Sequence, residues 1–216
     1  MAVSLPNGAL VAIASGYGAS KSMTALTNAD PGVATLESSH GVATGDIIEV
    51  TSGWSRLTDK VLRAGTVATN DVPLEGYDTT STSIYPSGAG TGSVREITGW
   101  TQLSQILTSS SSGGDQQFLE YQFLESDAKK RIPTFKNPSG ISFSIADDPS
   151  LSGYQLVSDA NDDRLARAVR ITLPSGALIF YNAYISLNRT PSLTVNELMA
   201  VEVTLSLLNE PVRYAS

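Results

Sequence analysis

The chain has 216 residues, of which 41% are hydrophobic and 16% are charged, so it can bury a sizeable core and is not expected to be disordered. Its net charge of -7 argues against a protein that grips nucleic acid, because such proteins are basic. With no cysteine and one histidine, the sequence excludes disulfides, thiolate or histidine-rich metal sites and cysteine nucleophiles.

The N-terminal segment opens with an apolar run at residues 10–14, which predicts a short strand, and continues as a Gly/Ser-rich segment to residue 32. No basic residue precedes Lys21, and a signal peptide needs a positive start and a longer apolar stretch. No apolar run approaches the roughly 20 residues that a membrane helix needs. We therefore expect a soluble protein that is made in a cytoplasm.

The next segment, residues 33–95, contains short apolar runs that are separated by Gly or Asn-Asp turns. Strands this short and this evenly spaced predict a small β-barrel, and the Gly/Ser/Thr-rich tract at 81–92 predicts a loop or a return linker. We expect this barrel to be inserted in a larger β-domain formed by residues 1–32 and 96–216. The expected strands of the segment are 34–36, 47–51, 61–67, 72–74 and 92–96.

Longer strands are expected after residue 94. Residues 118–124 and 141–146 alternate between apolar and polar side chains, a period of two that fits a strand with one dry and one wet face. The polar run at 109–114 is expected to be flexible. The charged stretch after the first strand, together with residues 133–140, predicts a long-armed hairpin or loop.

A single helix is expected near residue 150. Asp148 suits the N-cap and Pro149 suits the first helical position, and the helix is expected to end by Asn161 or Asp163. Three long strands complete the chain, at residues 167–173, 178–188 and 198–208. The predicted fold class is therefore all-β with one α-helix.

The chain offers few residues for chemistry. Residues 16–22 match a phosphate loop only superficially, since Gly18 lies three residues before Lys21 and not directly before it. His40 is interpreted as a turn residue, because a lone histidine needs a partner constellation to act as a base. The acidic group at 159–163 lacks the calcium-loop pattern and is interpreted as a solvated helix end. We expect no enzyme activity, no metal and no cofactor.

Two further features leave alternatives open. Trp54 and Trp100 could stack on sugars, but such residues more often belong to a core or an interface. The basic run at 129–131 could form a DNA patch. Its acidic neighbours Glu125 and Asp127 favour a protein–protein contact or a solvated tip instead.

The order of parts from Val94 onward resembles the major tail tube proteins of long-tailed (siphovirus-type) bacteriophages. The similarity is one of pattern: an alternating strand, a charged loop, a second alternating strand, one helix, a hairpin and a last alternating strand. The segments that carry it are LEYQFL (119–124), ESDAKKRIP (125–133), ISFSIA (141–146), DDPSLSGYQLVSDAND (147–162), ARAVRITLPSGALIFYNAYISLN (166–188) and ELMAVEVTLSLLNEP (197–211).

A second resemblance concerns the inserted segment. HGVATGDIIEV (40–50) followed by LEGYDTT (74–80) is similar to a small β-barrel found inserted in many phage structural proteins. The Asn-Gly turn that is usual in the middle is replaced here by Thr58-Asp59-Lys60. The resemblance implies that His40 and Asp46 make turns in a module without known chemistry.

The first resemblance implies a tail-tube β-sandwich or split barrel. In such proteins six subunits form a ring, their strands join in one continuous barrel, and rings stack into a tube through which DNA is ejected. The implied partners are further copies of the chain and the tail tip or initiator, tape measure and terminator proteins. The implied location is the tail of the virion, assembled in the host cytoplasm. The inserted barrel is expected outside the tube, because the lumen must clear duplex DNA.

Two sets of residues receive hypothetical roles under this resemblance. A polar, mostly acidic lumen repels phosphate, and mixed charges set the register of a contact between rings. The expected lumen-facing residues are Glu120, Gln122, Glu202, Thr204 and Ser206, which could instead lie on the outer surface of the tube. The expected inter-ring contact loop contains Glu125, Asp127, Lys129, Lys130 and Arg131.

Other interpretations remain open. A tail terminator or connector would form a single ring rather than a tube. Alternatively, the inserted barrel with Trp54 would bind a carbohydrate or a host surface, with the rest of the chain as a β-scaffold. A terminator or connector would differ from a tube subunit in what the purified chain assembles into. A carbohydrate-binding or host-binding module would differ in what the purified chain binds.

Overall fold

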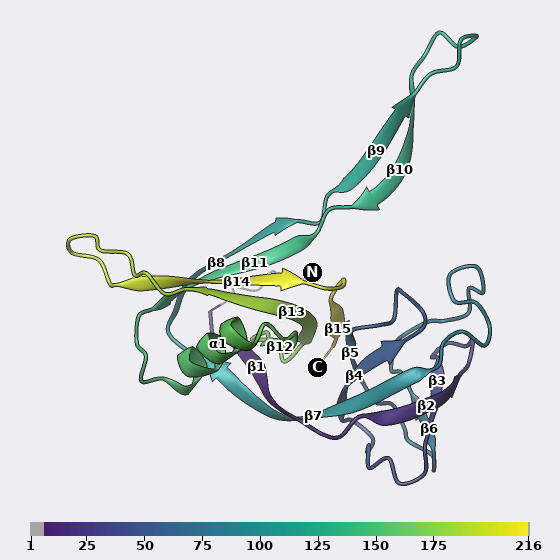
Figure 1. The fold of residues 1–216 in the computed structure, drawn as a ribbon, viewed down its shortest axis with the longest axis horizontal. Helices are drawn as coiled ribbons and strands as arrows, with labels where there is room; N and C mark the ends of the chain where they lie inside the picture. Colours follow the sequence, from purple (N-terminus) through teal and green to yellow (C-terminus); the bar gives the residue numbers. More distant parts are fainter. Residues whose placement is uncertain (1–6, 216) are drawn as a thin grey trace.

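The computed structural model describes residues 7–215, which form antiparallel β-strands and one α-helix (Figure 1). The predicted fold class, all-β with one helix, is confirmed. The strands before the helix are β1 (Leu10–Tyr17), β2 (Lys21–Leu26), β3 (Val33–Leu36), β4 (Ile47–Ser52), β5 (Lys60–Arg63), β6 (Asp71–Pro73), β7 (Gly92–Leu103), β8 (Ile106–Gly113), β9 (Gln116–Tyr121), β10 (Lys130–Lys136) and β11 (Ser139–Ala146). The remaining elements are α1 (Ser152–Asp163), β12 (Arg167–Thr172), β13 (Leu178–Asn188), β14 (Ala200–Leu207) and β15 (Val212–Tyr214).

Two segments that were expected to be irregular are strands. β2 lies in the Gly/Ser-rich N-terminal segment and pairs with β3 and β7. β8 covers most of the polar run at 109–114 and pairs along its length with β11. This run was expected to be flexible, but it is a paired strand. The side chains of β8 are almost all exposed, so no apolar alternation marks it in the sequence. Backbone pairing with a well-patterned neighbour fixes its conformation instead.

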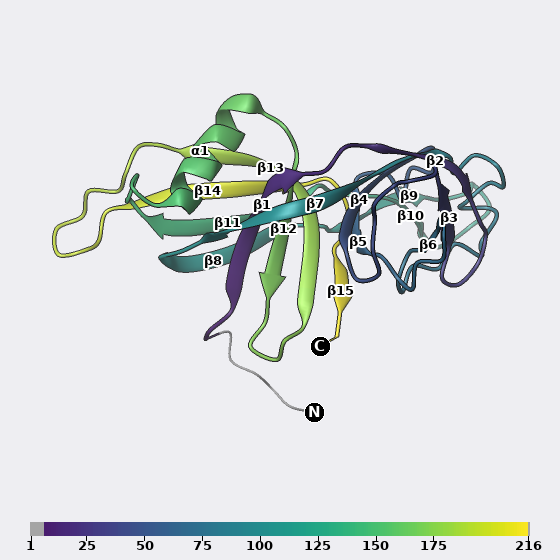
Figure 2. The ribbon, with the colours of Figure 1, turned by 90° about the horizontal axis from the view of Figure 1, so that it is seen from below.

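The strands β1, β12, β13, β14, β11 and β8 lie side by side in this order and are antiparallel. One face of this main sheet packs a hydrophobic core that α1 covers (Figure 2). Val169, Val203 and Phe143 are buried there, because alternate residues of a strand point to the same face. Val157 and Ala160 of α1 are fully buried against them.

The start of α1 differs from the prediction. Asp148 and Pro149 were expected to begin the helix, but it begins at Ser152 and has no side-chain cap. The Oδ1 atom of Asp148 instead accepts hydrogen bonds from the amide and the hydroxyl of Ser150, at 3.1 and 2.6 Å. The carboxylate is thus used in the turn that precedes the helix. The expected end at Asp163 is confirmed.

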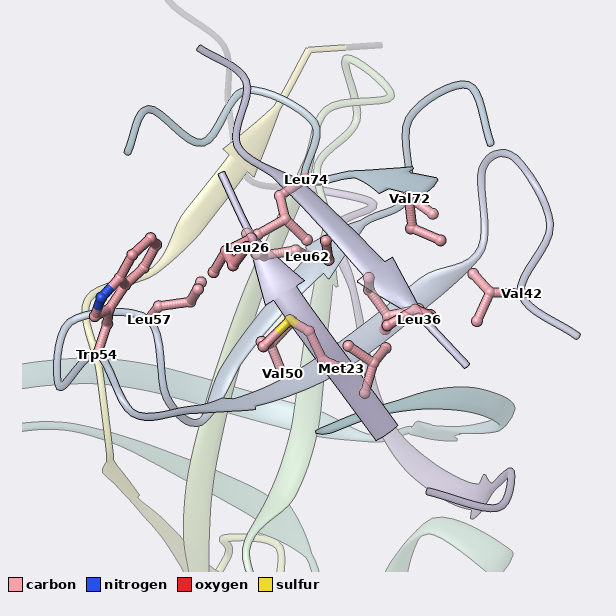
Figure 3. Packing of buried hydrophobic residues seen from close by; sticks show 14 of the residues in the cluster. Met23, Leu26, Leu36, Val42, Val50, Trp54, Leu57, Leu62, Val72 and Leu74 are labelled. Carbon is pink, nitrogen blue, oxygen red and sulfur yellow. The ribbon is translucent and has the colours of Figure 1, made fainter. Parts of the chain in front are cut away.

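A second hydrophobic core lies beside the main sheet, between strands β2 to β7 (Figure 3). Trp54, Leu62 and Leu74 are almost completely buried in it. Met23 of β2 also packs into this core, although it precedes the segment that was expected to form the inserted barrel. The strands follow the order β6-β3-β2-β7-β4-β5.

β7 belongs to both parts of the structure. Its residues 92–96 pair with β4, and its residues 97–103 pair with β1. At this junction the buried carboxylate of Glu49 accepts a hydrogen bond of 2.7 Å from Arg95 Nε. It also accepts one of 2.9 Å from Nδ2 of the buried Asn182, on β13 of the main sheet. One continuous strand, this polar cluster and a third hydrophobic cluster, which includes Val61 of β5 and Phe180 of β13, therefore join the two cores.

Candidate assembly surfaces

β9 and β10 form a hairpin that projects from the body of the protein (Figure 1). The hairpin is a separate two-stranded sheet, whose register runs from Lys130 opposite Tyr121 to Pro133 opposite Phe118. Within the described residues, none of the three hydrophobic clusters includes a hairpin residue. A two-stranded hairpin has marginal stability by itself. The side chains of β9 and β10 are largely exposed and are therefore available for contacts with another chain.

The residues of the predicted contact loop all lie on this hairpin. Glu125, Asp127 and Lys129 are exposed in the connection between the strands. Lys130 and Arg131 are not in a loop, because they are the first residues of β10 and pair with β9. The connection between the strands therefore spans residues 122–129, and it lies at the far end of the hairpin.

Two of the predicted lumen-facing residues are also on the hairpin. The carboxylate of Glu120 accepts a hydrogen bond of 2.8 Å from Arg131 Nε, across the two strands. Gln122 donates from Nε2 to the carbonyl oxygen of Ser126, at 2.6 Å. The structure thus pairs Glu120 with Arg131, which was assigned to the inter-ring contact loop. The carboxylate of Glu120 and the amide of Gln122 stabilise the hairpin itself.

The other three predicted lumen-facing residues lie on the main sheet. Glu202, Thr204 and Ser206 are alternate residues of β14, on the face opposite the core that contains Val201 and Val203. The structure does not bring Glu120 and Gln122 together with them, because the hairpin is a different sheet. The predicted set therefore divides into two separate surfaces.

The face that carries Glu202 continues across four strands and is rich in serine and threonine. Glu202 lies between Ser144 of β11 and Asn188 of β13, and Thr204 lies between Ser142 and Ser186. On β8 the aligned residues of this face are Thr108, Ser110 and Ser112. Sequence reasoning missed these three residues. The alternation of serine with apolar residues in ISFSIA, the partner strand, was the signal that could have extended the face.

The edge of the main sheet is formed by β8. Among the described strands it pairs only with β11, so the backbone groups on its other side have no strand partner. An unpaired edge of this length presents a row of N–H and C=O groups that can pair with another chain. β8 carries part of the serine-rich face and leads directly into the hairpin.

The root of the hairpin is fixed by charge. Lys136, at the end of β10, forms an ion pair with Glu210, which lies between β14 and β15. The hydrogen bond and the charge of Lys136 hold the pKa of Glu210 below its ordinary value. Arg56, Lys60 and Tyr77 line a cavity of about 560 Å³ beside this pair. Polar and charged side chains line most of the cavity.

The residues considered for other chemistry have structural contacts. His40 is buried, with Nε2 2.9 Å from the carbonyl oxygen of Thr69 and Nδ1 accepting the amide of Val42. Trp54 is 1% exposed and donates from Nε1 to the carbonyl oxygen of Pro86, so its ring is not a sugar platform. Within residues 7–215 no group of three or more potential metal-ligating side chains was found. In the same range no helix is long and apolar enough to span a membrane.

Two carboxylates of the acidic group at the end of α1, those of Asp162 and Asp163, are paired with arginines. Asp162 bonds to Arg189 at 2.7 Å, and Asp163 bonds to Arg167 at 2.5 Å. Arg189 holds the pKa of Asp162 below its ordinary value through a hydrogen bond. These carboxylates therefore stabilise contacts between α1 and the neighbouring strands.

Solved structures that are similar to about half of this chain come from contractile injection systems. The chain is similar to the sheath/tube terminator of the extracellular contractile injection system PVC, with 18% identity and a TM-score of 0.39 over 49% of this chain and 84% of that chain. It is similar to the PVC sheath–tube complex, with 21% identity and a TM-score of 0.37 over 50% and 80%. It is also similar to the tube-terminating cap of the anti-feeding prophage, with 17% identity and a TM-score of 0.37 over 53% and 83%.

The family assignment comes from the sequence. A comparison with curated proteins found no match. The model of the family described as phage tail tube protein, TTP, matches residues 52–216, which is more than half of the chain. The matched range includes the main sheet from β7 onward, the hairpin, α1 and part of the second core. The chain therefore belongs to the phage tail tube protein family and is a structural component of a phage tail.

Proposed function

We propose that six copies of this chain form a ring, that rings stack into the tube of a phage tail, and that DNA leaves the virion through its lumen. Membership of the tail tube family supports a structural role rather than an enzymatic one. The observation that carries the proposal is the form of the main sheet. It has one dry face, one wet face and an edge strand, β8, whose outer side has no strand partner within the described residues, and a projecting hairpin follows that strand.

The unpaired edge of β8 supports closure into a ring. In a ring of identical subunits each chain offers one surface to one neighbour and a different surface to the other neighbour, so contacts are heterologous and close by rotation. Pairing of β8 with a neighbouring chain would satisfy its free backbone groups and continue the sheet from subunit to subunit. A continuous barrel of this kind leaves no exposed edge in the assembled ring.

The serine-rich face of the main sheet is suited to the lumen. Hydroxyl groups are neutral and hydrated, and they do not bind phosphate as lysine or arginine side chains do. Glu202 adds one carboxylate per subunit, so a ring of six would place six negative charges around the passing DNA. This charge repels phosphate and favours rapid passage. The outer position of the second core follows from the same arrangement, because that core lies beside the sheet and not on its wet face.

The hairpin is suited to a contact between rings. Its tip carries Glu125, Asp127, Lys129 and Lys130, and mixed charges of this kind specify register without promoting aggregation. The tail tip or initiator, the tape measure protein and the terminator are the further partners of such a tube. No cofactor has a role in this assembly.

Substitution of Glu202 tests the lumen assignment. In phage that carry Glu202→Lys we expect tails of normal length and slow or blocked DNA ejection, because six lysines in the lumen would bind phosphate. Glu37→Lys is the charge-matched control, since it makes the same change of charge at an exposed residue directly after β3; the surface ion pair with Lys21 that it removes contributes less than about 1 kcal/mol. Tail assembly is measured by electron microscopy, and ejection by release of DNA from purified virions. Normal ejection from the Glu202→Lys phage would contradict the assignment of Glu202 to the lumen.

A further inference from the structure

The hairpin and the loop between β13 and β14, residues 189–199, leave the main sheet at opposite ends. At one end Gly140 of β11 pairs with Ser206 of β14, and the hairpin follows directly. At the other end Ala146 pairs with Ala200, where the 189–199 loop joins β14. Figure 1 shows the two projections far apart on the molecule. They cannot meet within one chain.

One face of the hairpin is apolar and exposed. Leu119 and Ile132 lie opposite each other and share this face with Tyr121, whose ring centre is 5.3 Å from that of Phe123. The exposed fractions are 59% for Leu119, 55% for Phe123 and 48% for Ile132. The other face carries the Glu120–Arg131 ion pair together with Phe118, which lies opposite Pro133 and is 53% exposed. The apolar face therefore lacks a cover.

The 189–199 loop is also apolar and exposed. Leu193, Val195 and Leu198 are 80%, 85% and 69% exposed, and Met199 is 51% exposed. Together they form a second apolar patch at the other end of the same strands. Contiguous exposed apolar side chains of this kind mark interaction sites on soluble proteins.

Charged side chains flank both patches, and in residues 7–215 none of them forms an ion pair: Glu125, Asp127, Lys129 and Lys130 on the hairpin, and Glu197 in the 189–199 loop. Within the described residues, Lys129 and Lys130 have no carboxylate within ion-pair distance, and both lie next to the apolar face of the hairpin. Glu197, in the 189–199 loop, likewise has no cationic partner in the part of the chain that the structure describes. Lys130 lies opposite Tyr121 on the apolar face, so a contact through this face would bring Lys130 near Glu197 of the other projection.

The direction of the strands gives the contact its place in an assembly. Strands of a closed barrel tilt by roughly 35–45° from the barrel axis, so the two ends of each strand face opposite rims. In a ring built from this sheet, every hairpin would therefore leave one rim and every 189–199 loop would leave the other. When rings stack, the hairpins of one ring meet the loops of the next.

We infer that the apolar face of the β9–β10 hairpin packs on the 189–199 loop of a second copy of this chain in the adjacent ring, with Lys129 and Lys130 near Glu197 of that copy. This inference rests on the proposed tube and names the surface that receives the hairpin. The contact is heterologous: each chain gives its hairpin to one neighbour and its loop to another. Repetition of the same contact extends the tube without limit in length.

Cysteine cross-linking tests the contact, because the natural chain has no cysteine to interfere. The double variant Leu119→Cys/Val195→Cys is assembled into tubes and treated with a short bismaleimide. A head-to-tail contact predicts a ladder of dimers, trimers and longer species on a denaturing gel. Each single variant is expected to stay monomeric. The control Leu119→Cys/Ser87→Cys, whose second cysteine is on an exposed loop of the second core, is also expected to stay monomeric.

The outcomes separate this inference from the proposed function. Tubes of the double variant that give no ladder would overturn the contact and leave the tube intact. Failure of the unmodified chain to form tubes under any condition would overturn the tube and the contact together.

A charge exchange covers the case in which the cysteine variants do not assemble. Lys129→Glu/Lys130→Glu is expected to lose tube formation, and addition of Glu197→Lys is expected to restore it. Failure of the added Glu197→Lys substitution to restore tube formation would contradict the contact.

Discussion

The junction between the two cores depends on the ion pair of Glu49 and Arg95, and Arg95→Ala tests this. The carboxylate of Glu49 is 7% exposed and contacts both Nε and Nη2 of Arg95 at 2.7 Å. After truncation of Arg95 the buried charge keeps one hydrogen bond, from Asn182 at 2.9 Å. The comparison variant is Arg131→Ala, which breaks the Glu120–Arg131 pair of the hairpin.

The two substitutions have very different expected costs. Removal of one partner of a buried ion pair costs about 3–5 kcal/mol, because the remaining charge stays desolvated. The side chain of Arg95 is 38% exposed, so water can reach the vacated space and we expect the lower end, about 3 kcal/mol. The side chains of Arg131 and Glu120 are 68% and 46% exposed, and such a pair contributes less than about 1 kcal/mol.

Equilibrium unfolding in urea, followed by tryptophan fluorescence, measures both values. Trp54 lies in the second core, and Trp100 packs on Phe180 beside the main sheet, so the signal reports on both parts. We expect a large fall in the midpoint for Arg95→Ala and almost none for Arg131→Ala. Equal costs for the two variants would refute the conclusion that the buried pair stabilises the junction.

Three further predictions concern the helix, acid stability and assembly. Gly153→Ala should lower the melting temperature, at a cost of about 1–3 kcal/mol, because its Cβ would lie 2.5 Å from the backbone oxygen of Gln102; a melting temperature equal to that of the unmodified chain would contradict the close packing of α1 on β7. A hydrogen bond from Arg63 holds the pKa of Glu75 below its ordinary value of 4.5, so the stability from this pair is present above that pH and is lost as the pH falls through the folded value. Glu75→Gln should therefore flatten the acid side of the stability curve, and an unchanged curve would count against the pair. Reversal of Lys129, Lys130 and Arg131 to Glu should leave the melting temperature within a few degrees of the original and abolish tube formation in sedimentation assays, whereas normal tubes would exclude a contact role for these residues.

The sequence was most informative where one face of a strand is buried. The apolar alternation predicted the strand at 141–146 and the bounds of β13, because burial on one face requires a period of two. The helix was predicted from its caps, and its start was wrong by a few residues. Asp148 has two possible uses, as a helix cap or in a local turn, and only the arrangement around Ser150 decides between them.

The edge strand β8 and the hairpin were harder to predict, because both faces of these strands are exposed in the isolated chain. β8 has polar side chains at nearly every position, so no pattern separates it from a flexible linker. Glu120 and Glu202 were assigned to one surface because both lie on polar faces of alternating strands. Alternation gives the face of a residue within its own strand, and it does not say which sheet the strand joins. Glu120 lies on β9, which pairs with β10 in the projecting hairpin, whereas Glu202 lies on β14 of the main sheet.

The central claim is tested most directly by electron cryomicroscopy of the purified, concentrated protein at a resolution that traces strands. The proposal predicts long hollow tubes of stacked six-fold rings, in which β8 pairs with a neighbouring subunit and Glu202 faces the lumen. Discrete rings that never stack would contradict it and indicate a terminator or connector. Tubes with Glu202 on the outer surface would contradict the assignment of the wet face.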